Sequence, residues 1–518
     1  MAMPGHPTLH GKRLSHAGLL ASVLGLAACA APAGGPGHAG GNGSLRLDPL
    51  LFANRVTWGA DSASVRQIEV DGAASYLEQQ LRPGPAVLPA EVQAQIDAMT
   101  ISRVPLPQLA AELAQQKMAA DAAADDGARQ AARQQLNQSL NTLAREAATR
   151  SLLRDLYSPR QLQEQMTWFW LNHFSVFQHK GPIRALLADY EDQLRAHALG
   201  RFRDLLGVTA HHPAMLHYLD NAQNAAGHIN ENYARELMEL HTLGVDGGYS
   251  QRDVQELARV LTGVGIVHPA QLREQPAAAV REGLFEFNPR RHDNGEKTLL
   301  GQPLHAKGLA EVDEALDRLA RHPATARFIS RKLAQYFVGD EPPPRLVAAM
   351  ADTFLRRDGQ IADTLRTLFR SPEFAASLGR RFKDPMHYVV SAVRLAYDGK
   401  PILNAGPMLA WINRMGEPLY GHQTPDGYPL LSSAWASPGQ MTTRFEIARA
   451  IGNGSAGLFR GEGLSPMARP AFPQLAGPLY YRHWQALISP ATRQALDQAE
   501  SPQEWNTFLL SSPDFMNR

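Results

Sequence analysis

The sequence has almost no cysteine and no excess of charge of either sign. Cys29 is the only cysteine among 518 residues, so no disulfide can form within the chain. Lysine and arginine number 51 against 50 aspartates and glutamates, a balance that indicates neither a nucleic acid nor an acidic polymer as partner. No apolar run reaches the ~20 residues of a membrane-spanning helix. A hydrophobic content of 44% with 19% charged residues is typical of a folded globular protein.

The single cysteine closes a segment that is similar to a bacterial lipoprotein signal. Residues 12–13 are a basic Lys-Arg pair, residues 17–28 are mostly apolar, and residues 26–29 read Leu-Ala-Ala-Cys, like a lipobox. We therefore predict a signal peptide at 1–28 and lipidation of Cys29, which anchors the protein to a membrane. Ala30 follows, with no aspartate to retain it at the inner membrane, so we expect the outer membrane, facing the periplasm or the surface. An ordinary secretory peptide cut after an A-x-A site is the alternative.

Composition divides the rest of the chain into a tether and a body. Residues 29–44 are rich in Gly, Pro and Ala and predict a flexible tether. Residues 45–518 predict a helical body, with 45–306 and 307–518 as candidate subdomains. At 518 residues the chain can bury a large core and has room for two or three domains.

Helical periodicity dominates the body, so we predict a mainly α, multi-helix fold. We expect two long helices between 88 and 150, interrupted near Pro105 and Pro107. Two exceptions are expected: a small β-hairpin at about 283–300, turning at the sequence HDNG, and a long, ordered, irregular loop at about 403–442. Further helices are expected at roughly 158–177, 183–206, 231–243, 251–262, 308–319, 323–337, 344–356, 360–369 and 384–397.

Residues 230–263 carry the densest local signals. Asn230 is a good N-cap for a helix at 231–243, Gly244 a C-terminal stop, and Ser250 with Asp253 a capping pair for the next helix. On the first helix His241 lies on the apolar side. The opposite stripe is polar and consists of Asn232, Arg235, Glu236 and Glu239.

This segment resembles the signature of the bacterial family known as domain of unknown function 1800. The resemblance covers most of the chain and implies a largely helical fold without a known activity. It also implies a protein partner, because genes of the family often neighbour those of domain of unknown function 1501, which resembles alkaline phosphatases and sulfatases. The motifs that carry the resemblance are NRVTWG at 54–59, FWLNHF at 169–174, LGRFRDLL at 199–206, HPAMLHYLDN at 212–221, NENYARE at 230–236, HDNGEKTLLG at 292–301, HPATARFISRKLAQYFV at 322–338 and SPEF at 371–374.

The FWLNHF helix is the main candidate for chemistry. Apolar residues cover every side of this turn, so Asn172 and His173 should be buried and must find hydrogen-bond partners. They either lock the packing of helices or belong to a site. In the second case we expect His173 as general base or metal ligand, Glu236 as acid or ligand, and Arg235 beside them. Candidate binding residues are Asn172, Asp220, Asn221, Asn232 and Glu239.

Metal binding receives little local support. Neither E-x-x-H nor H-E-x-x-H occurs, and Glu239 and His241 point to nearly opposite sides of their helix. A metal site assembled from distant segments is still an alternative, with His173, His212, Asp220 and Glu236 as candidates. No cofactor is indicated.

Two functions follow as expectations. The first is a lipid-anchored, extracytoplasmic protein that binds a partner or an envelope ligand beside a phosphatase-like neighbour. The alternative is a hydrolase-type envelope enzyme, with or without a metal ion, that uses a buried His, Asn, Glu and Arg cluster.

Overall fold

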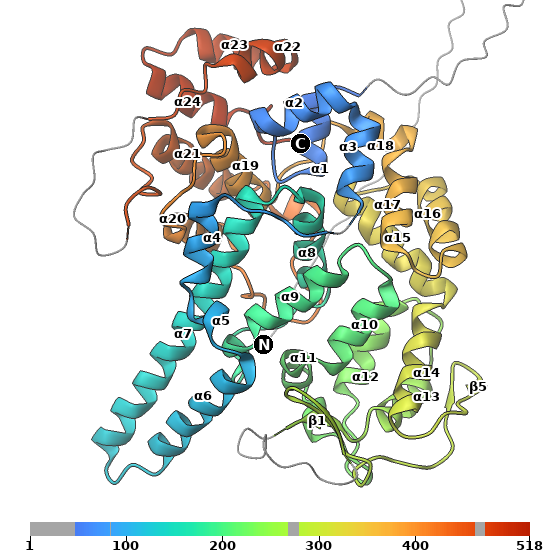
Figure 1. The fold of residues 1–518 in the computed structure, drawn as a ribbon. Coiled ribbons are helices and arrows are strands. Elements are labelled where there is room, and N and C mark those ends of the chain that lie inside the picture. Colours follow the sequence, from blue (N-terminus) through green and yellow to red (C-terminus); the bar gives the residue numbers. More distant parts are fainter. Residues whose placement is uncertain (1–46, 83, 268–278, 462–471) are drawn as a thin grey trace, which may run out of the picture. The chain divides into compact units, whose positions relative to one another are not determined.

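Helices make up most of the body, as the sequence predicts (Figure 1). The computed structural model describes residues 47–82, 84–267, 279–461 and 472–518. Every element below belongs to one compact unit, Arg46–Arg518. The predicted signal peptide, Cys29 and the tether lie outside the described residues. None of the helices in the described ranges is both long and apolar enough to cross a membrane.

The first part of the body holds the helices that frame the FWLNHF motif. The elements are α1 (Pro49–Val56), α2 (Ser62–Asp71), α3 (Ala73–Gln80), α4 (Ala90–Asp97), α5 (Thr100–Arg103), α6 (Leu106–Asp121), α7 (Asp126–Tyr157) and α8 (Gln161–His173). In place of the two long helices expected between 88 and 150 there are four, since α5 ends before Pro105 and α6 begins after it.

The middle part carries the family-like motifs. Its helices are α9 (Leu187–His197), α10 (Phe202–His211), α11 (Pro213–Tyr218), α12 (Asn232–Glu236) and α13 (Gln251–Val260). The helix expected at 183–206 is divided between α9 and α10, with Gly200 in the turn that separates them.

The last part adds eleven helices within the described residues. They are α14 (Leu309–Ala320), α15 (Pro323–Phe337), α16 (Pro344–Arg356), α17 (Ile361–Phe369), α18 (Pro372–Ser377), α19 (Pro385–Tyr397), α20 (Gly406–Arg414), α21 (Pro438–Gly452), α22 (Gln485–Leu487), α23 (Pro490–Asp497) and α24 (Pro502–Ser511). The irregular loop expected at 403–442 is therefore shorter, because α20 buries Met408, Trp411 and Ile412 against the core and α21 begins at Pro438. Residues 415–437 remain largely irregular and ordered.

The small β structure is present, but its pairing differs from the predicted hairpin. Strand β3 (Phe285–Phe287) pairs antiparallel with both β1 (Val264–Ile266) and β2 (Val280–Glu282), and β4 (Thr298–Leu299) pairs with β5 (Gln302–Pro303). Gly283, at φ +58°, makes the tight turn between β2 and β3. The HDNG sequence does not form a hairpin turn, because its side chains bind neighbouring helices.

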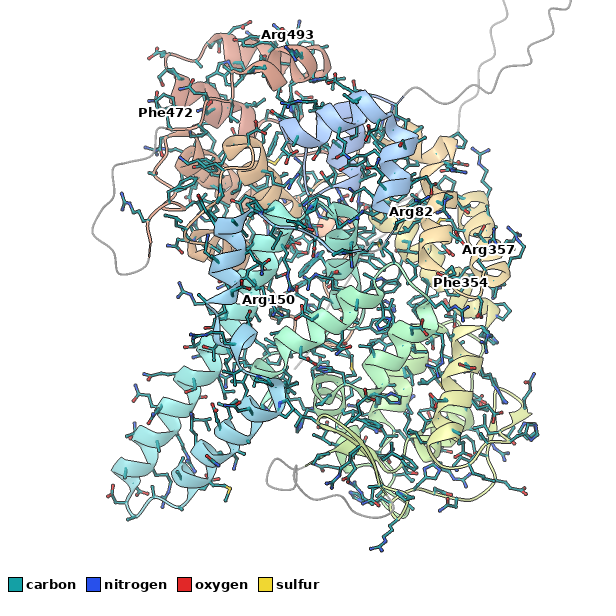
Figure 2. All side chains as sticks on the ribbon, viewed as in Figure 1. Arg82, Arg150, Phe354, Arg357, Phe472 and Arg493 are labelled. Atoms are coloured by element: carbon teal, nitrogen blue, oxygen red, sulfur yellow. The ribbon has the colours of Figure 1, made fainter. Side chains whose placement is uncertain are left out.

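One hydrophobic cluster contains buried side chains from both sides of residue 306, for example Leu261 and Leu316. A buried ionic network adds to it at α7, α8 and α9, where Arg195 donates to Glu164 at 2.8 Å and also pairs with Glu191. Arg150 of α7 (Figure 2) donates to the carbonyl of Ala188 at 2.7 Å. The subdomain boundary near 306 stays a prediction, since the core itself does not mark it.

Candidate functional site

The segment 230–263 has most of the expected caps but an unexpected helical form. Ser250 and Asp253 form the expected capping box, and Gly244 has φ +83°. The N-cap of the first helix is Glu231, and Asn230, one residue earlier, accepts from the Asn232 amide at 2.9 Å. The helix expected at 231–243 is α-helical only as α12, because Leu237–Thr242 is a π-helical segment. Such wide turns are rare and concentrate at functional positions.

Most of the predicted polar stripe bonds to neighbours within the same segment. Arg235 donates to Glu231 at 3.1 Å and to Gln251 at 2.9 Å, and Glu239 accepts from the Tyr249 hydroxyl at 3.3 Å. Asn232 donates to the carbonyl of Leu219 at 3.2 Å. Among the residues that the structure describes, no group hydrogen-bonds the half-buried Glu236 carboxylate. Glu236 is therefore the carboxylate of the stripe that, within the described residues, has no hydrogen-bond partner.

His173 is buried as predicted, and its two ring nitrogens define its protonation. Nε2 lies 3.0 Å from the carbonyl oxygen of His241, which only accepts, so Nε2 carries the proton. Nδ1 then accepts from Lys332 Nζ at 3.0 Å. Burial, and then the charge of Lys332, hold the pKa of His173 well below its usual value. His173 is therefore neutral, and both of its ring nitrogens are occupied, one of them by its neighbour Lys332.

That neighbour, Lys332 on α15, is half-buried and has no ion pair within the described ranges. Burial lowers the pKa of Lys332 to about 8, although the carboxylate of Asp426 opposes the shift. The Phe328 ring lies 5.6 Å from Nζ. Lys332 is thus poised to exchange a proton near neutral pH.

His241 belongs to the π-helical segment, and its ring lies next to that of His173. Its side chain is fully buried, and neither ring nitrogen has a hydrogen-bond partner within the described part of the chain. Burial, with the charge of Lys332 as the second cause, lowers the pKa of His241 to about 3. His241 is a neutral ring next to His173, with 6.1 Å between the ring centroids.

Two carboxylates complete the electrostatics of the site. Burial raises the pKa of Glu236, and the nearby charges of Glu239 and Asp426 raise it further. The pKa of Asp426 is lowered although burial opposes this, because Thr424 donates to it at 2.6 Å and His422 lies 3.1 Å away. The pKa of Glu236 therefore lies above that of Asp426.

Asn172 positions the loop that carries Asp426. Its amide donates to the Tyr428 carbonyl at 2.9 Å and accepts from the Tyr428 amide at 2.6 Å. Tyr218 donates to the carbonyl of Gln423 at 2.8 Å and holds the same loop from α11. Asn172, a candidate binding residue, thus clamps residues 422–428 against α8.

The remaining candidates hold local structure. Asp220 has φ +60° and pairs with Lys180 at 2.8 Å, and the buried Asn221 donates to the carbonyls of Leu261 and Val264. His212 caps α11. The candidate metal ligands His173, His212, Asp220 and Glu236 thus have separate surroundings, and no described set of three or more His, Cys, Asp and Glu side chains is arranged to hold a metal ion.

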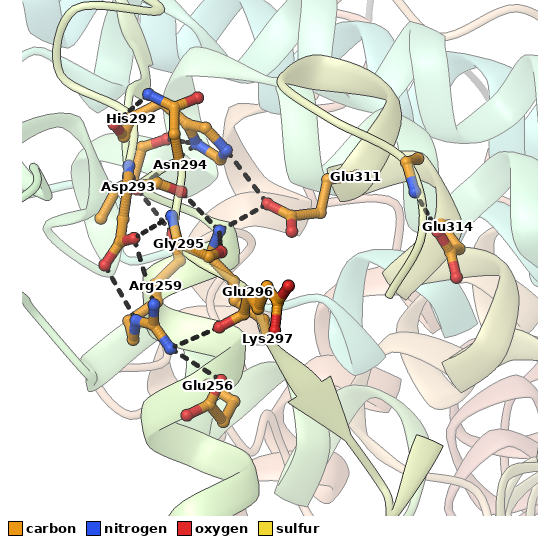
Figure 3. Close-up of polar contacts among 12 residues, drawn as sticks. Glu256, Arg259, His292, Asp293, Asn294, Gly295, Glu296, Lys297, Glu311 and Glu314 are labelled. Carbon is orange, nitrogen blue, oxygen red and sulfur yellow. Dashed lines mark hydrogen bonds and ion pairs between the residues drawn. The ribbon is translucent and has the colours of Figure 1, made fainter. Parts of the chain in front are cut away.

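The HDNGEK motif forms a second polar cluster (Figure 3). Lys297, fully buried, donates to Glu311 at 2.7 Å, and His292 lies between the Thr262 carbonyl at 2.8 Å and Glu311 at 3.0 Å. Although burial opposes it, the hydrogen bonds from His292 and Lys297 keep the pKa of Glu311 below its usual value. This cluster fastens the loop between α13 and α14.

Sequence reasoning missed Lys332 and Asp426. Lys332 adjoins the buried Leu333 on a helix that was predicted correctly, so a lysine at the margin of an apolar face was the available signal. Asp426 lies in a Thr-Pro-Asp-Gly turn, a sequence typical of any surface loop. Neither signal indicates which distant residue each would meet.

The fold and the site define a class: a mainly α protein in which a π-helical segment, a neutral buried histidine and a half-buried lysine lie together. Within that class the chain belongs to the family described as "Protein of unknown function (DUF1800)", whose model matches residues 51–517. This confirms the resemblance. No curated protein and no solved structure matches the chain.

Proposed function

We propose that the protein is an envelope enzyme of the hydrolase type, in which Lys332 transfers protons. The observation that carries the proposal is the hydrogen bond of 3.0 Å between Lys332 and the buried, neutral His173, at a half-buried position without an ion pair. An unpaired ammonium is costly at such a position, so the neutral amine becomes accessible near neutral pH. Proton transfer is most efficient for groups with a pKa near the working pH.

The residues suggest a division of roles. The neutral Lys332 amine accepts a proton from a water molecule, whose oxygen forms a bond to the electrophilic centre of the substrate. The Lys332 ammonium formed in this way then returns the proton to the leaving group as the old bond breaks, so one group serves first as base and then as acid. His173 does not touch the substrate and acts as a positioning residue for Lys332.

Turnover of chromogenic substrates tests this proposal. We would assay the mature chain with nitrophenyl esters, glycosides, phosphates and sulfates. One class should be hydrolysed, with a rate that rises through pH 8. Lys332→Met should lower the rate by about 10²-fold or more, while Lys307→Met, at an exposed lysine, should not change it. No turnover of any class by the wild type, or unchanged turnover by Lys332→Met, would reject the enzyme.

The location is a proposal of its own, supported by the Leu-Ala-Ala-Cys sequence at 26–29. The protein is a lipoprotein held at the outer membrane by acyl chains on Cys29, because two or more chains give stable anchoring. Cys29→Ala should move the protein from the membrane fraction to the soluble fraction and abolish labelling with radioactive palmitate. Membrane association that survives the substitution would contradict the anchor.

A purely binding role beside a phosphatase-like protein of the family domain of unknown function 1501 is the second candidate. The family resemblance supports this candidate. So do the contacts of Arg235 and Glu239, because these two side chains of the polar stripe are already bonded to neighbours rather than directed at a substrate. Copurification of the two proteins from native envelopes tests it. A complex that survives Lys332→Met while no substrate is hydrolysed would favour binding over catalysis.

A further inference from the structure

A cavity separate from the Lys332 site lies among α6, α9, α10 and the β2–β3 turn. Its volume is about 360 Å³, within the range of small-molecule sites. Leu106, Val208 and Phe285 form part of its apolar wall, and Asp189 and Glu282 provide carboxylates. The cavity therefore offers both apolar surface and negative charge.

Asp189 is held in place by a buried histidine. His212 Nδ1 accepts from the Ala214 amide at 3.1 Å, so Nδ1 is unprotonated and Nε2 carries the proton. Nε2 donates to Asp189 Oδ2 at 3.0 Å, and the His212 side chain is 5% exposed. Within the described ranges no donor occupies the other oxygen, Oδ1. The fold thus orients the Asp189 carboxylate and leaves its Oδ1 atom free to accept a hydrogen bond from a ligand.

The charge of the lining is negative. Among the residues that the structure describes, no lysine or arginine lines the cavity. His211, whose ring lies 4.6 Å from that of Phe285, has its pKa lowered by burial, so this ring is neutral at neutral pH. Glu282 lies at an exposed position on the rim. A carboxylate beside an aromatic wall complements a cation with an apolar body.

We infer that this cavity binds a small amphiphilic organic cation, a primary amine with a hydrophobic body. The ammonium pairs with Asp189 at the open oxygen, and the apolar body packs against Phe285 and Leu106. This binding site is independent of the chemistry proposed for Lys332, and either can fail without the other.

Titration calorimetry of the full mature chain with benzylamine tests the inference, with benzyl alcohol as the uncharged control. Benzylamine should bind, benzyl alcohol should bind at least about tenfold more weakly, and Asp189→Asn should raise the Kd for benzylamine about tenfold. Asp352→Asn removes one exposed acid of α16 and should leave the Kd unchanged.

Two results would overturn the inference: equal binding of the amine and the alcohol, or a benzylamine Kd that does not change in Asp189→Asn. If Asp189→Asn lacks a cooperative thermal transition, the Kd for benzylamine is measured with Glu282→Gln in its place. Its position is exposed, so the fold should be kept, and the Kd for benzylamine should still rise several-fold. An unchanged Kd there rejects the site.

Discussion

At the scale of single residues, ring nitrogens decide what the buried histidines of this protein can do. His212 and His322 each accept a backbone amide at Nδ1, from Ala214 at 3.1 Å and Ala324 at 3.2 Å, and both precede a proline that opens a helix. Accepting requires an unprotonated nitrogen, so these caps hold only in the neutral ring. His173 follows the same logic with Lys332 as its donor. These three histidines thus act as neutral acceptors.

His241 has no such partner, and this should appear in the pH dependence of stability. Its pKa is about 3 in the folded chain against 6.5 in the unfolded chain, so the unfolded state binds the proton first. Stability is therefore lost as pH falls from 6.5 toward 3, at up to about 1.4 kcal/mol per pH unit for this one proton.

The variant His241→Phe should reduce that slope, because it removes the proton and two unpartnered nitrogens. Urea unfolding at pH 8, 6 and 5 measures the effect. His305→Phe, at an exposed histidine, should keep the wild-type slope. Parallel pH profiles of the wild type and His241→Phe would contradict the assignment of this slope to His241.

Two glycines with positive φ allow the cost of a strained backbone to be distinguished from the cost of a steric clash. A Cβ at Gly427 (φ +76°) would lie 2.0 Å from the carbonyl oxygen of Asn172, whereas one at Gly416 (φ +82°) meets nothing within 4 Å. Gly416→Ala should cost about 1–2 kcal/mol from the left-handed backbone alone. Gly427→Ala should cost at least twice as much and release the loop 422–428, measured by urea unfolding and proteolysis. Equal losses of stability in the two variants would show that the contact between residue 427 and Asn172 relaxes easily.

The burial of Asn172 and His173 could be predicted from the sequence, because aromatic residues surround them on every side of one helix. Their partners could not. Tyr428 lies 256 positions from Asn172, and Lys332 lies 159 positions from His173. Local periodicity shows which side chains are buried, whereas tertiary packing decides what they meet. Sequence reasoning therefore finds the buried residues but not their distant partners.

At the scale of elements, caps could be predicted and the helical type could not. The capping box of Ser250 and Asp253 depends on residues three apart, which local sequence displays. The π-helical segment at 237–242 depends on an i to i−5 pattern, seen where the Leu243 amide donates to Met238 at 2.8 Å. Its first four residues, Leu237–Leu240, are good α-helix formers, so propensity predicts an ordinary helix.

The HDNGEK loop depends on one buried cation. Lys297→Met removes the ammonium that Glu311 and the carbonyl of Gly295 bind, and leaves the Glu311 carboxylate underpaired. Breaking a buried pair in this way costs about 3–5 kcal/mol. Urea unfolding should show that loss, and Lys307→Met, at an exposed site, should change stability by less than about 0.5 kcal/mol. Similar midpoints for the two variants would show that the loop does not need this cation.

At the scale of the whole molecule, the hydrophobic cluster makes cooperative unfolding the expected behaviour. Buried residues on both sides of 306 share that cluster, so the two halves should lose their packing together. Differential scanning calorimetry should give one transition with equal calorimetric and van't Hoff enthalpies. Two resolved transitions would instead support separate subdomains at 45–306 and 307–518.

The clamp between Asn172 and Tyr428 also bears on the order of folding. Its two hydrogen bonds close a loop of 256 residues, and loop-closure entropy grows with length, so the clamp cannot form early by local search. The clamp can therefore form only after α8 has packed. The residues around Asp426 should then be among the last to become protected from hydrogen exchange during refolding, and among the first to open in the native state. An active site completed by such a loop would be assembled last.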